Sequence, residues 1–307
     1  MARCRLCGTE GPLRNSHIVP AFVYRWFKES SATGYIRLAS APNRRVQDGF
    51  VCRTLCPQCE QLLGESEKEF RERLFKPVTD GAAAPTAYGS WLCLFAASLC
   101  WRALHLYYEK GWISNISGPR TAVVTNSLKR WSTGIRRSEI DFACRDFHFI
   151  PSGTMEEMQG LDPPPNINRY LSRYVQIDVA TGDDQAFVYA KLGPAILLGF
   201  LQHPAEAQWP DTAIDPRGGT FPRQLELPGR FADYLFDHAR SVLRSQRSIS
   251  EQQGRSIGEA YRSNIARAAD SGTLASLAAD VEMFGRDAVF RGQLESGLGS
   301  DPDRDKA

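Results

Sequence analysis

The segment LCPQCEQLLG, residues 55–64, carries a Cys-x-x-Cys pair, Cys56 and Cys59, at the point where an amphipathic pattern begins. Apolar residues recur at helical spacing after this pair, namely Leu62, Leu63, Phe70 and Leu74. Pro77 follows them and is expected to stop the helix. The cysteine pair is therefore predicted to open a helix, whose N-terminus favours the negative charge of thiolates.

A second Cys-x-x-Cys pair, Cys4 and Cys7, lies near the start of the chain and is followed by Gly8. A glycine there completes a tight turn through a positive φ. Two such pairs supply four thiolates, the usual number for a tetrahedral structural zinc site. The predicted zinc ligands are Cys4, Cys7, Cys56 and Cys59. Cys52 is an alternative to Cys56, although the two-residue gap to Cys59 favours Cys56.

The cysteine content indicates a reducing compartment. Eight cysteines among 307 residues are too few for a disulfide scaffold, and the first residues show no secretory signal pattern. Clustered thiols in such a chain are more often zinc ligands than cystines, which predicts a cytoplasmic protein. Cys93 and Cys100 lie in an apolar run and are interpreted as core thiols.

Charge is distributed unevenly along the chain. Residues 1–76 carry 13 Lys/Arg against 8 Asp/Glu, whereas residues 77–307 carry 24 against 27. A basic N-terminal part suits contact with a polyanion, although an ordinary solvated surface explains the same numbers. Residues 81–101 contain no charged side chain, and Arg102 follows at once. Because Gly and Pro interrupt this run, a buried helix is preferred to a membrane span.

The pattern along the chain predicts an α+β protein. A zinc domain is expected over residues 1–77, a larger domain of helices and antiparallel sheet over 78–298, and a disordered tail over 299–307. Between about residues 118 and 202, short β-branched and aromatic runs predict strands, and the last three, YVQIDVA, AFVYAKL and AILLGFL, predict an antiparallel meander. Helices are expected again over about 230–290, with interruptions at Gly272 and Gly285.

The order Cys-x-x-Cys, SHIVP at residues 16–20 and LCPQCEQLLG resembles the HNH (ββα-metal) nucleases in their treble-clef form. The resemblance covers residues 1–65 and implies metal-dependent cleavage of DNA phosphodiester bonds. It implies that His17 is the general base, and that Glu60 helps to hold Mg²⁺ or another divalent ion as a catalytic cofactor, beside the structural Zn²⁺. The wider sequence resembles bacterial HNH-like proteins, some encoded near phage-defence genes, which implies a defence setting.

The chain departs from the family pattern. Ser16 replaces the expected metal carboxylate, Val51 replaces an Asn, and Leu63 replaces a Lys. Asp48, or Glu65 or Glu67 further along the helix, is expected to supply the missing carboxylate. Two interpretations therefore stand: a divergent nuclease, or a non-catalytic zinc-binding subunit that contacts nucleic acid or a protein partner.

Two groups of basic residues are predicted to contact nucleic acid. Arg44 and Arg45 are expected at phosphates. Arg130, Arg136 and Arg137 are expected to follow a single strand around Trp131 by charge and stacking, unless they form only a solvated face. No ATP-binding or dinucleotide-binding motif is present. The expected partners are DNA and a protein of a larger assembly, with no membrane.

Overall fold

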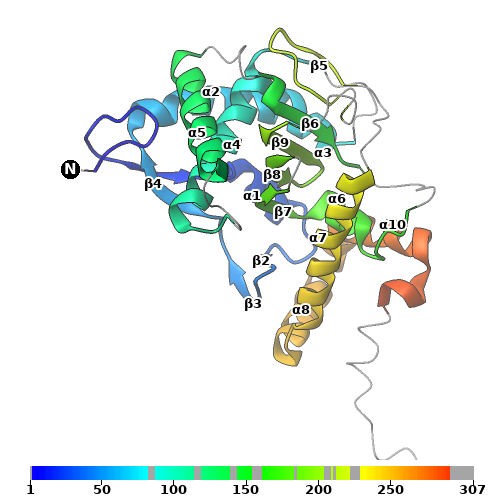
Figure 1. Cartoon of the computed structure of the whole chain (residues 1–307). Helices are drawn as coiled ribbons and strands as arrows, with labels where there is room; N and C mark the ends of the chain where they lie inside the picture. The colour runs from blue at the N-terminus through cyan, green and yellow to red at the C-terminus, as the bar shows by residue number, and fades with distance from the viewer. Residues whose placement is uncertain are drawn as a thin grey trace, which may run out of the picture. The chain divides into compact units, whose positions relative to one another are not determined.

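The computed structural model describes residues 2–81, 87–113, 119–138, 144–153, 161–182, 185–203, 209, 212–221 and 229–290 (Figure 1). The chain divides into two compact units, and each combines segments that are distant in sequence. The first unit comprises Met1–Tyr24, Asp48–Ser152 and Tyr174–Gly229, and the second comprises Arg25–Gln47, Gly153–Arg173 and Arg230–Ala307. The linear boundary expected at residue 77 stays a prediction, and the expected disordered tail lies outside the described residues.

A four-stranded antiparallel sheet forms the centre of the first unit. Its order is β6 (Phe147–Pro151), β9 (Ala195–Gln202), β8 (Ala186–Leu192) and β7 (Val175–Thr181) (Figure 1). The pairing of β7 with β8 and of β8 with β9 confirms the predicted meander. Every residue of β8 and all of β9 but Gln202 are buried, so these central strands are covered on both faces.

Helix α4 (Trp91–Lys110) packs on β8 and β9 and ends at Gly111, whose φ is +66°. Because most of its side chains are buried, the predicted buried helix is confirmed. In the part of the chain that the structure describes, no helix is both long enough and apolar enough to cross a bilayer. Cys100 is a free, buried thiol as expected, but Cys93 is disulfide-bonded, which sequence spacing did not indicate.

Two elements of the first unit differ from the sequence-based expectations. Residues Pro119–Arg137 form helix α5, which packs on α4, in a region that was expected to be mainly β. Helix α2 (Pro57–Phe70) continues through a π-helical turn, η1 (Arg71–Phe75), into α3 (Lys76–Thr79), so Pro77 does not stop the helix. Because proline has no backbone N–H, it removes one donor from this continuous helix, and α3 ends two residues later at Thr79.

A two-stranded antiparallel ribbon precedes α2. Strand β1 (Arg14–His17) pairs with β4 (Val51–Leu55), and α2 follows β4 directly. The small strands β5 (Ala87–Tyr88) and β10 (Gly219–Thr220) form a second pair, and the 3₁₀ turn η2 (Cys144–Asp146) leads into β6. Helix α1 (Ala21–Glu29) follows β1 and carries the chain from the first unit into the second.

The second unit is mainly helical. The hairpin of β2 (Ile36–Leu38) and β3 (Ala41–Val46) belongs to it. Its helices are α6 (Ile167–Arg173), α7 (Gly229–Arg247), α8 (Glu251–Ser263), α9 (Ile265–Ala269) and α10 (Gly272–Phe284). The fully buried carboxylate of Asp280 on α10 accepts hydrogen bonds from the Asn168 backbone (2.8 Å) and from Arg169 Nε (2.6 Å) on α6.

Helices are present where the sequence predicted them in the C-terminal region, but their breaks fall at capping residues. The side chain of Asn264 accepts a hydrogen bond from the Arg267 backbone and begins α9. Ser271 accepts from the Leu274 backbone and begins α10, so Gly272 is the first residue of a helix and not an interruption. Gly285, with φ +79°, ends α10 as expected.

Candidate metal centre

The first cysteine pair lies in a tight turn near the N-terminus. The Cys4 backbone N–H donates to the Thr9 carbonyl (2.9 Å), and the Gly8 N–H donates to the Cys4 carbonyl (2.9 Å). Gly8 has a φ of +78°, as the sequence predicted. Arg3 Nε closes the turn from outside by donating to the Gly8 carbonyl (2.7 Å). This turn directs both thiols of the pair to one side.

The second cysteine pair lies at the start of α2. Cys56 is the N-cap residue, with extended backbone angles (φ −76°, ψ 165°), and Pro57 begins the helix. Cys59 therefore lies in the first turn, where unpaired backbone N–H groups and the helix dipole favour thiolates. The prediction that the second pair opens a helix is confirmed.

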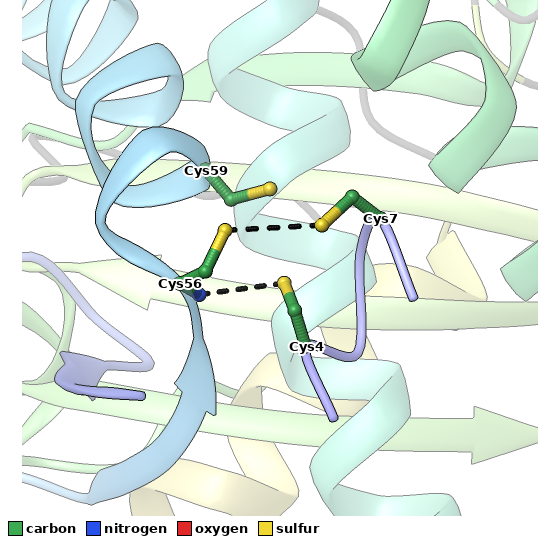
Figure 2. A group of neighbouring side chains, drawn as sticks. All are labelled: Cys4, Cys7, Cys56 and Cys59. Carbon is green, nitrogen blue, oxygen red and sulfur yellow. Dashed lines mark hydrogen bonds between the residues drawn. The ribbon is translucent and has the colours of Figure 1, made fainter. Parts of the chain in front are cut away.

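The four thiols converge on one point (Figure 2). Their sulfur atoms all lie within 4.8 Å of one another, and the Cys7 and Cys56 sulfurs are 3.8 Å apart. Zinc bound tetrahedrally at about 2.3 Å requires sulfurs about 3.8 Å apart, so the spacing fits this ion. The Cys56 N–H also donates to the Cys4 sulfur (3.4 Å). Cys52 is outside the cluster, so Cys56 is the member of the group.

The four thiols of the cluster can be ionised together only if a cation offsets their negative charge. Burial acts to raise the pKa of the Cys7 thiol. Hydrogen bonds involving Thr9 and the thiols of Cys4 and Cys59 outweigh this effect and lower the pKa to about 6. Burial, together with the neighbouring thiols, raises the pKa of Cys59. Cys4, Cys56 and Cys59 are each less than a tenth exposed. Thiolates that are this close together and this poorly solvated repel one another unless a divalent ion neutralises them.

The residue before His17 meets the first turn of α2. Ser16 is fully buried, and its hydroxyl donates a hydrogen bond to Glu60 Oε1. Residue 16 and residue 60 are the two positions at which the family resemblance places metal ligands. The contact therefore brings together the two positions that the resemblance pairs, with a hydroxyl in place of one carboxylate.

His17 lies beside this contact at the end of β1. It pairs with Val51, whereas Ser16 pairs with Cys52, so His17 and Ser16 are expected on opposite faces of the ribbon. The His17 Nε2 atom is shielded from solvent and has no hydrogen-bond partner among the residues that the structure describes. The Nε2 atom is thus available to accept a hydrogen bond, and a water must reach it before His17 can act as a general base.

The predicted catalytic residues do not form a second cluster of the kind made by the cysteines. Within the described ranges, the cysteine group is the set of His, Cys, Asp or Glu ligand atoms that converges, and it includes none of His17, Asp48 and Glu60. Asp48 is exposed, in the loop before β4. The catalytic roles of these three residues therefore stay a prediction.

Arg102 is a buried cation that sequence analysis did not assign to the site. It lies on α4, is 4% exposed, and donates to the His17 carbonyl (2.7 Å) and to Glu67 Oε1 (2.7 Å). Glu67, a candidate metal carboxylate, is thus ion-paired. A lone arginine after a long uncharged run was the available signal, because a buried guanidinium needs an anionic partner.

The basic residues predicted to contact nucleic acid differ in their surroundings, and their contacts with nucleic acid stay a prediction. Arg44 and Arg45 are exposed on β3, and the Arg45 guanidinium lies over the Tyr35 ring at 3.9 Å. Arg136 and Arg137 are exposed in the last turn of α5. The expected stacking of bases on Trp131 is wrong, because this ring is 1% exposed.

Asp146 explains the position of Trp131 and of its basic neighbour. Trp131 Nε1 donates to Asp146 Oδ2 (2.7 Å), and Arg130 pairs with the same oxygen. His203 Nε2 lies 2.8 Å from Asp146 Oδ1. Arg130 is therefore tied to a buried carboxylate, although its side chain remains 42% exposed and accessible to a phosphate.

His148 on β6 adds a pH-dependent term to the stability of the first unit. It is 6% exposed, its Nδ1 lies 2.7 Å from Thr212 Oγ1, and burial together with His203 lowers its pKa to about 4, against the opposing charge of Asp146. The unfolded chain therefore takes up a proton at higher pH than the folded chain does. Stability supplied by neutral His148 is lost as the pH falls from about 6.5 to about 4.

We expect this loss to amount to up to about 3 kcal/mol. Urea unfolding of the wild type and of His148→Gln at pH 7.5 and pH 4.5 measures it. Because the thiol cluster also titrates, the relevant quantity is the difference between the two proteins, which should shrink at the lower pH. A difference that is independent of pH would contradict the assignment.

Comparison of the chain with protein-family models, with curated proteins and with solved structures finds no match. The site itself therefore carries the functional argument. The observations establish a chain of helices and antiparallel sheet whose N-terminal part holds a candidate zinc site formed by Cys4, Cys7, Cys56 and Cys59.

Proposed function

We propose that the chain is a divergent HNH-like nuclease that cleaves DNA phosphodiester bonds. The observation that carries the proposal is the contact between Ser16 and Glu60 directly beside His17. The order of a cysteine turn, an antiparallel ribbon and a helix that begins at the second cysteine pair agrees with a treble-clef module and supports it. A zinc domain over residues 1–77 and a role in phage defence are further parts of the proposal.

His17, Ser16 and Glu60 have separate roles in the proposed reaction. His17 accepts a proton from a water, and the oxygen of this water bonds to phosphorus. The bond between phosphorus and the leaving sugar oxygen breaks at the same time. Ser16 orients the Glu60 carboxylate by its hydrogen bond. Glu60, with Asp48 as the second predicted carboxylate, would hold a divalent ion, which would supply positive charge for the phosphate oxygens. One or two carboxylates suffice for Mg²⁺, because substrate phosphates complete its coordination.

We expect His17→Ala to lower DNA nicking in Mg²⁺, Mn²⁺ or Ni²⁺ by about 100-fold or more, because a general base typically contributes that much. Glu60→Gln, which preserves the shape of the side chain, should raise the divalent-ion concentration that is needed for half-maximal nicking, because it removes a ligand charge. Nicking of a supercoiled plasmid measures both, with bound zinc determined for each protein. Asn15→Ala, on the exposed surface of the same strand, is the matched control. Nicking by His17→Ala at the wild-type rate would remove His17 from the mechanism.

A non-catalytic zinc-binding subunit is the second candidate function. It is favoured by the Ser16 hydroxyl, which already occupies one Glu60 oxygen, and by the lack of a converging third ligand among the described residues. In that case His17 serves the packing of the ribbon, and the module binds nucleic acid or a protein. Binding of DNA without cleavage, in wild type and His17→Ala alike, would establish this candidate.

A further inference from the structure

Two arginines lie directly opposite one another in the hairpin of β2 and β3 (Figure 1). Arg37 on β2 pairs with Arg45 on β3 in the antiparallel register. Opposite residues of an antiparallel pair share a face and lie close together, and like charges at such a pair repel one another. Burial, and then the charge of Arg45, lower the pKa of Arg37, which agrees with two guanidinium groups that face each other. The hairpin therefore carries an unfavourable pair of positive charges.

The arginine pair has no acidic partner among the residues that the structure describes. Besides Arg45, the titratable side chains that act on Arg37 are the phenols of Tyr35 and Tyr261. The Arg45 guanidinium lies 3.9 Å from the centre of the Tyr35 ring. The Nε atom of Arg37 is shielded from solvent and has no hydrogen-bond partner in the described ranges. A shielded donor of a cation without an acceptor indicates that an anion belongs at this place.

The hairpin is fixed to the helices of the second unit. When its amide is oriented to satisfy both neighbours, Gln253 on α8 accepts from Arg37 Nη2 (2.8 Å) and donates to the Asn43 carbonyl (3.1 Å). The Asn43 side chain donates to the Ser248 carbonyl (3.1 Å) and accepts from the Ser250 N–H (2.8 Å). The backbone that carries the pair is thus ordered before any ligand arrives, which lowers the entropic cost of binding.

Helix α8 brings a phenol, and not a carboxylate, to the arginine pair. Tyr261 lies near Arg37, since each side chain affects the pKa of the other. The acidic residues of α8, Glu251 and Glu259, are exposed. Glu259 projects in a different direction from Tyr261 because the two are only two positions apart on the helix. Glu251 lies 3.8 Å from Arg255, so its charge already has a partner.

A tetrahedral oxyanion matches the arginine pair better than a carboxylate does. A guanidinium donates two parallel N–H bonds to one edge of an anion. A carboxylate has one such edge, which a single arginine fills, whereas a phosphate group has several and can receive both arginines. We propose that Arg37 and Arg45 together bind one phosphate dianion, either free or carried by a small ester. The site lies within the second unit and goes beyond the proposed nuclease.

The structure also changes the partner that the sequence suggested for Arg45. Arg44 and Arg45 were expected to contact phosphates together, but successive residues of a strand point to opposite faces. Arg44 therefore lies on the other face of β3, where it is exposed. Arg44→Gln removes the same charge from the neighbouring position and is the matched control for Arg45→Gln.

Calorimetric titration of the full-length chain with inorganic phosphate, at constant ionic strength, tests the inference. The wild type should bind about one phosphate per chain. Arg37→Gln and Arg45→Gln should each weaken binding by about 10- to 100-fold, the range for a hydrogen bond to a charged group. Arg44→Gln should retain the wild-type affinity. A parallel titration with phenyl phosphate, a monoester dianion, distinguishes a free phosphate from an ester.

Thermal unfolding gives a second measurement on the same proteins. Phosphate should raise the Tm of the wild type and of Arg44→Gln, because a ligand that binds only the folded state stabilises it. It should not raise the Tm of the double variant Arg37→Gln/Arg45→Gln. Acetate at equal ionic strength should have no effect on any of them. If circular dichroism shows that Arg37→Gln is misfolded after losing its contact with Gln253, Arg45→Gln carries the test.

The outcomes separate a specific site from general attraction between charges. Equal loss of affinity in Arg44→Gln and Arg45→Gln would overturn the pair, because charge alone would then explain the binding. Stabilisation by acetate equal to that by phosphate, or a wild type that binds neither phosphate probe, would also overturn it. Tighter binding of phenyl phosphate than of inorganic phosphate would support the pair and assign an ester as its ligand. These measurements involve no DNA, so they are independent of the outcome of the nicking assay.

Discussion

Cys59→Ser is expected to abolish stable zinc binding and to unfold the N-terminal ribbon and turn. The four sulfurs lie within 4.8 Å of one another and three of the cysteines are buried, so an oxygen in place of one thiolate leaves an incomplete and strained ligand set. Structural zinc contributes roughly 10–16 kcal/mol of apparent binding free energy in small zinc domains at neutral pH. We therefore expect much of the stability of this part of the chain to depend on bound zinc.

Metal analysis after dialysis should find about one zinc per wild-type chain and none bound to Cys59→Ser. Cys52→Ser is the matched control, because Cys52 is a free cysteine on β4, just before Cys56, but lies outside the cluster. It should retain zinc and the wild-type melting behaviour. Equal zinc content in Cys59→Ser and the wild type, or loss of zinc only in Cys52→Ser, would refute the ligand set.

Arg102→Met is expected to lower the free energy of unfolding by about 3 kcal/mol, near the lower end of the range for a broken buried ion pair. The substitution leaves Glu67 without its partner and the His17 carbonyl without a donor. The lower end is appropriate because the Glu67 side chain is still 23% exposed and regains some water. Urea unfolding followed by circular dichroism measures the change.

The matched comparison is the exposed pair of Arg5 and Glu109, whose side chains are 50% and 35% exposed. Arg5→Gln should cost less than about 1 kcal/mol, because solvent screens an exposed pair. The double variant Arg102→Met/Glu67→Gln should recover part of the loss, since no buried charge then lacks a partner. If Arg102→Met lowers the free energy of unfolding no more than Arg5→Gln does, the proposed stabilisation by the contacts of Arg102 with Glu67 and with the His17 carbonyl is wrong.

The clustering of the four cysteines was predictable because each Cys-x-x-Cys pair is a local signal. Two thiols of one turn point the same way, and a helix that starts at Cys56 is visible in the apolar spacing of α2. The meander was predictable for a similar reason, since β7, β8 and β9 follow one another with short turns between them. Local pattern is sufficient where the partner is the next element in the chain.

Contacts between distant segments were not visible in the sequence. The meeting of Ser16 with Glu60, and of Arg102 with the His17 carbonyl, depends on how the ribbon packs against α2 and α4. The error at Trp131 has a simpler cause. Adjacent residues of a helix project in different directions, so Lys129 and Arg130 are exposed while Trp131 enters the core. A mixed basic and aromatic composition is no evidence that the aromatic ring reaches solvent.

The segment Arg25–Gln47 belongs to the second unit, although the segments before and after it belong to the first. A metal ion bound by the cysteine cluster would join Cys4 and Cys7 to Cys56 and Cys59, and the segment between the two pairs passes through the second unit. We expect that a single proteolytic cut within that segment would leave two fragments held together by the β1–β4 pairing and, with zinc bound, by the ion. Expression of either unit alone requires a rearranged chain, since no single truncation point separates them.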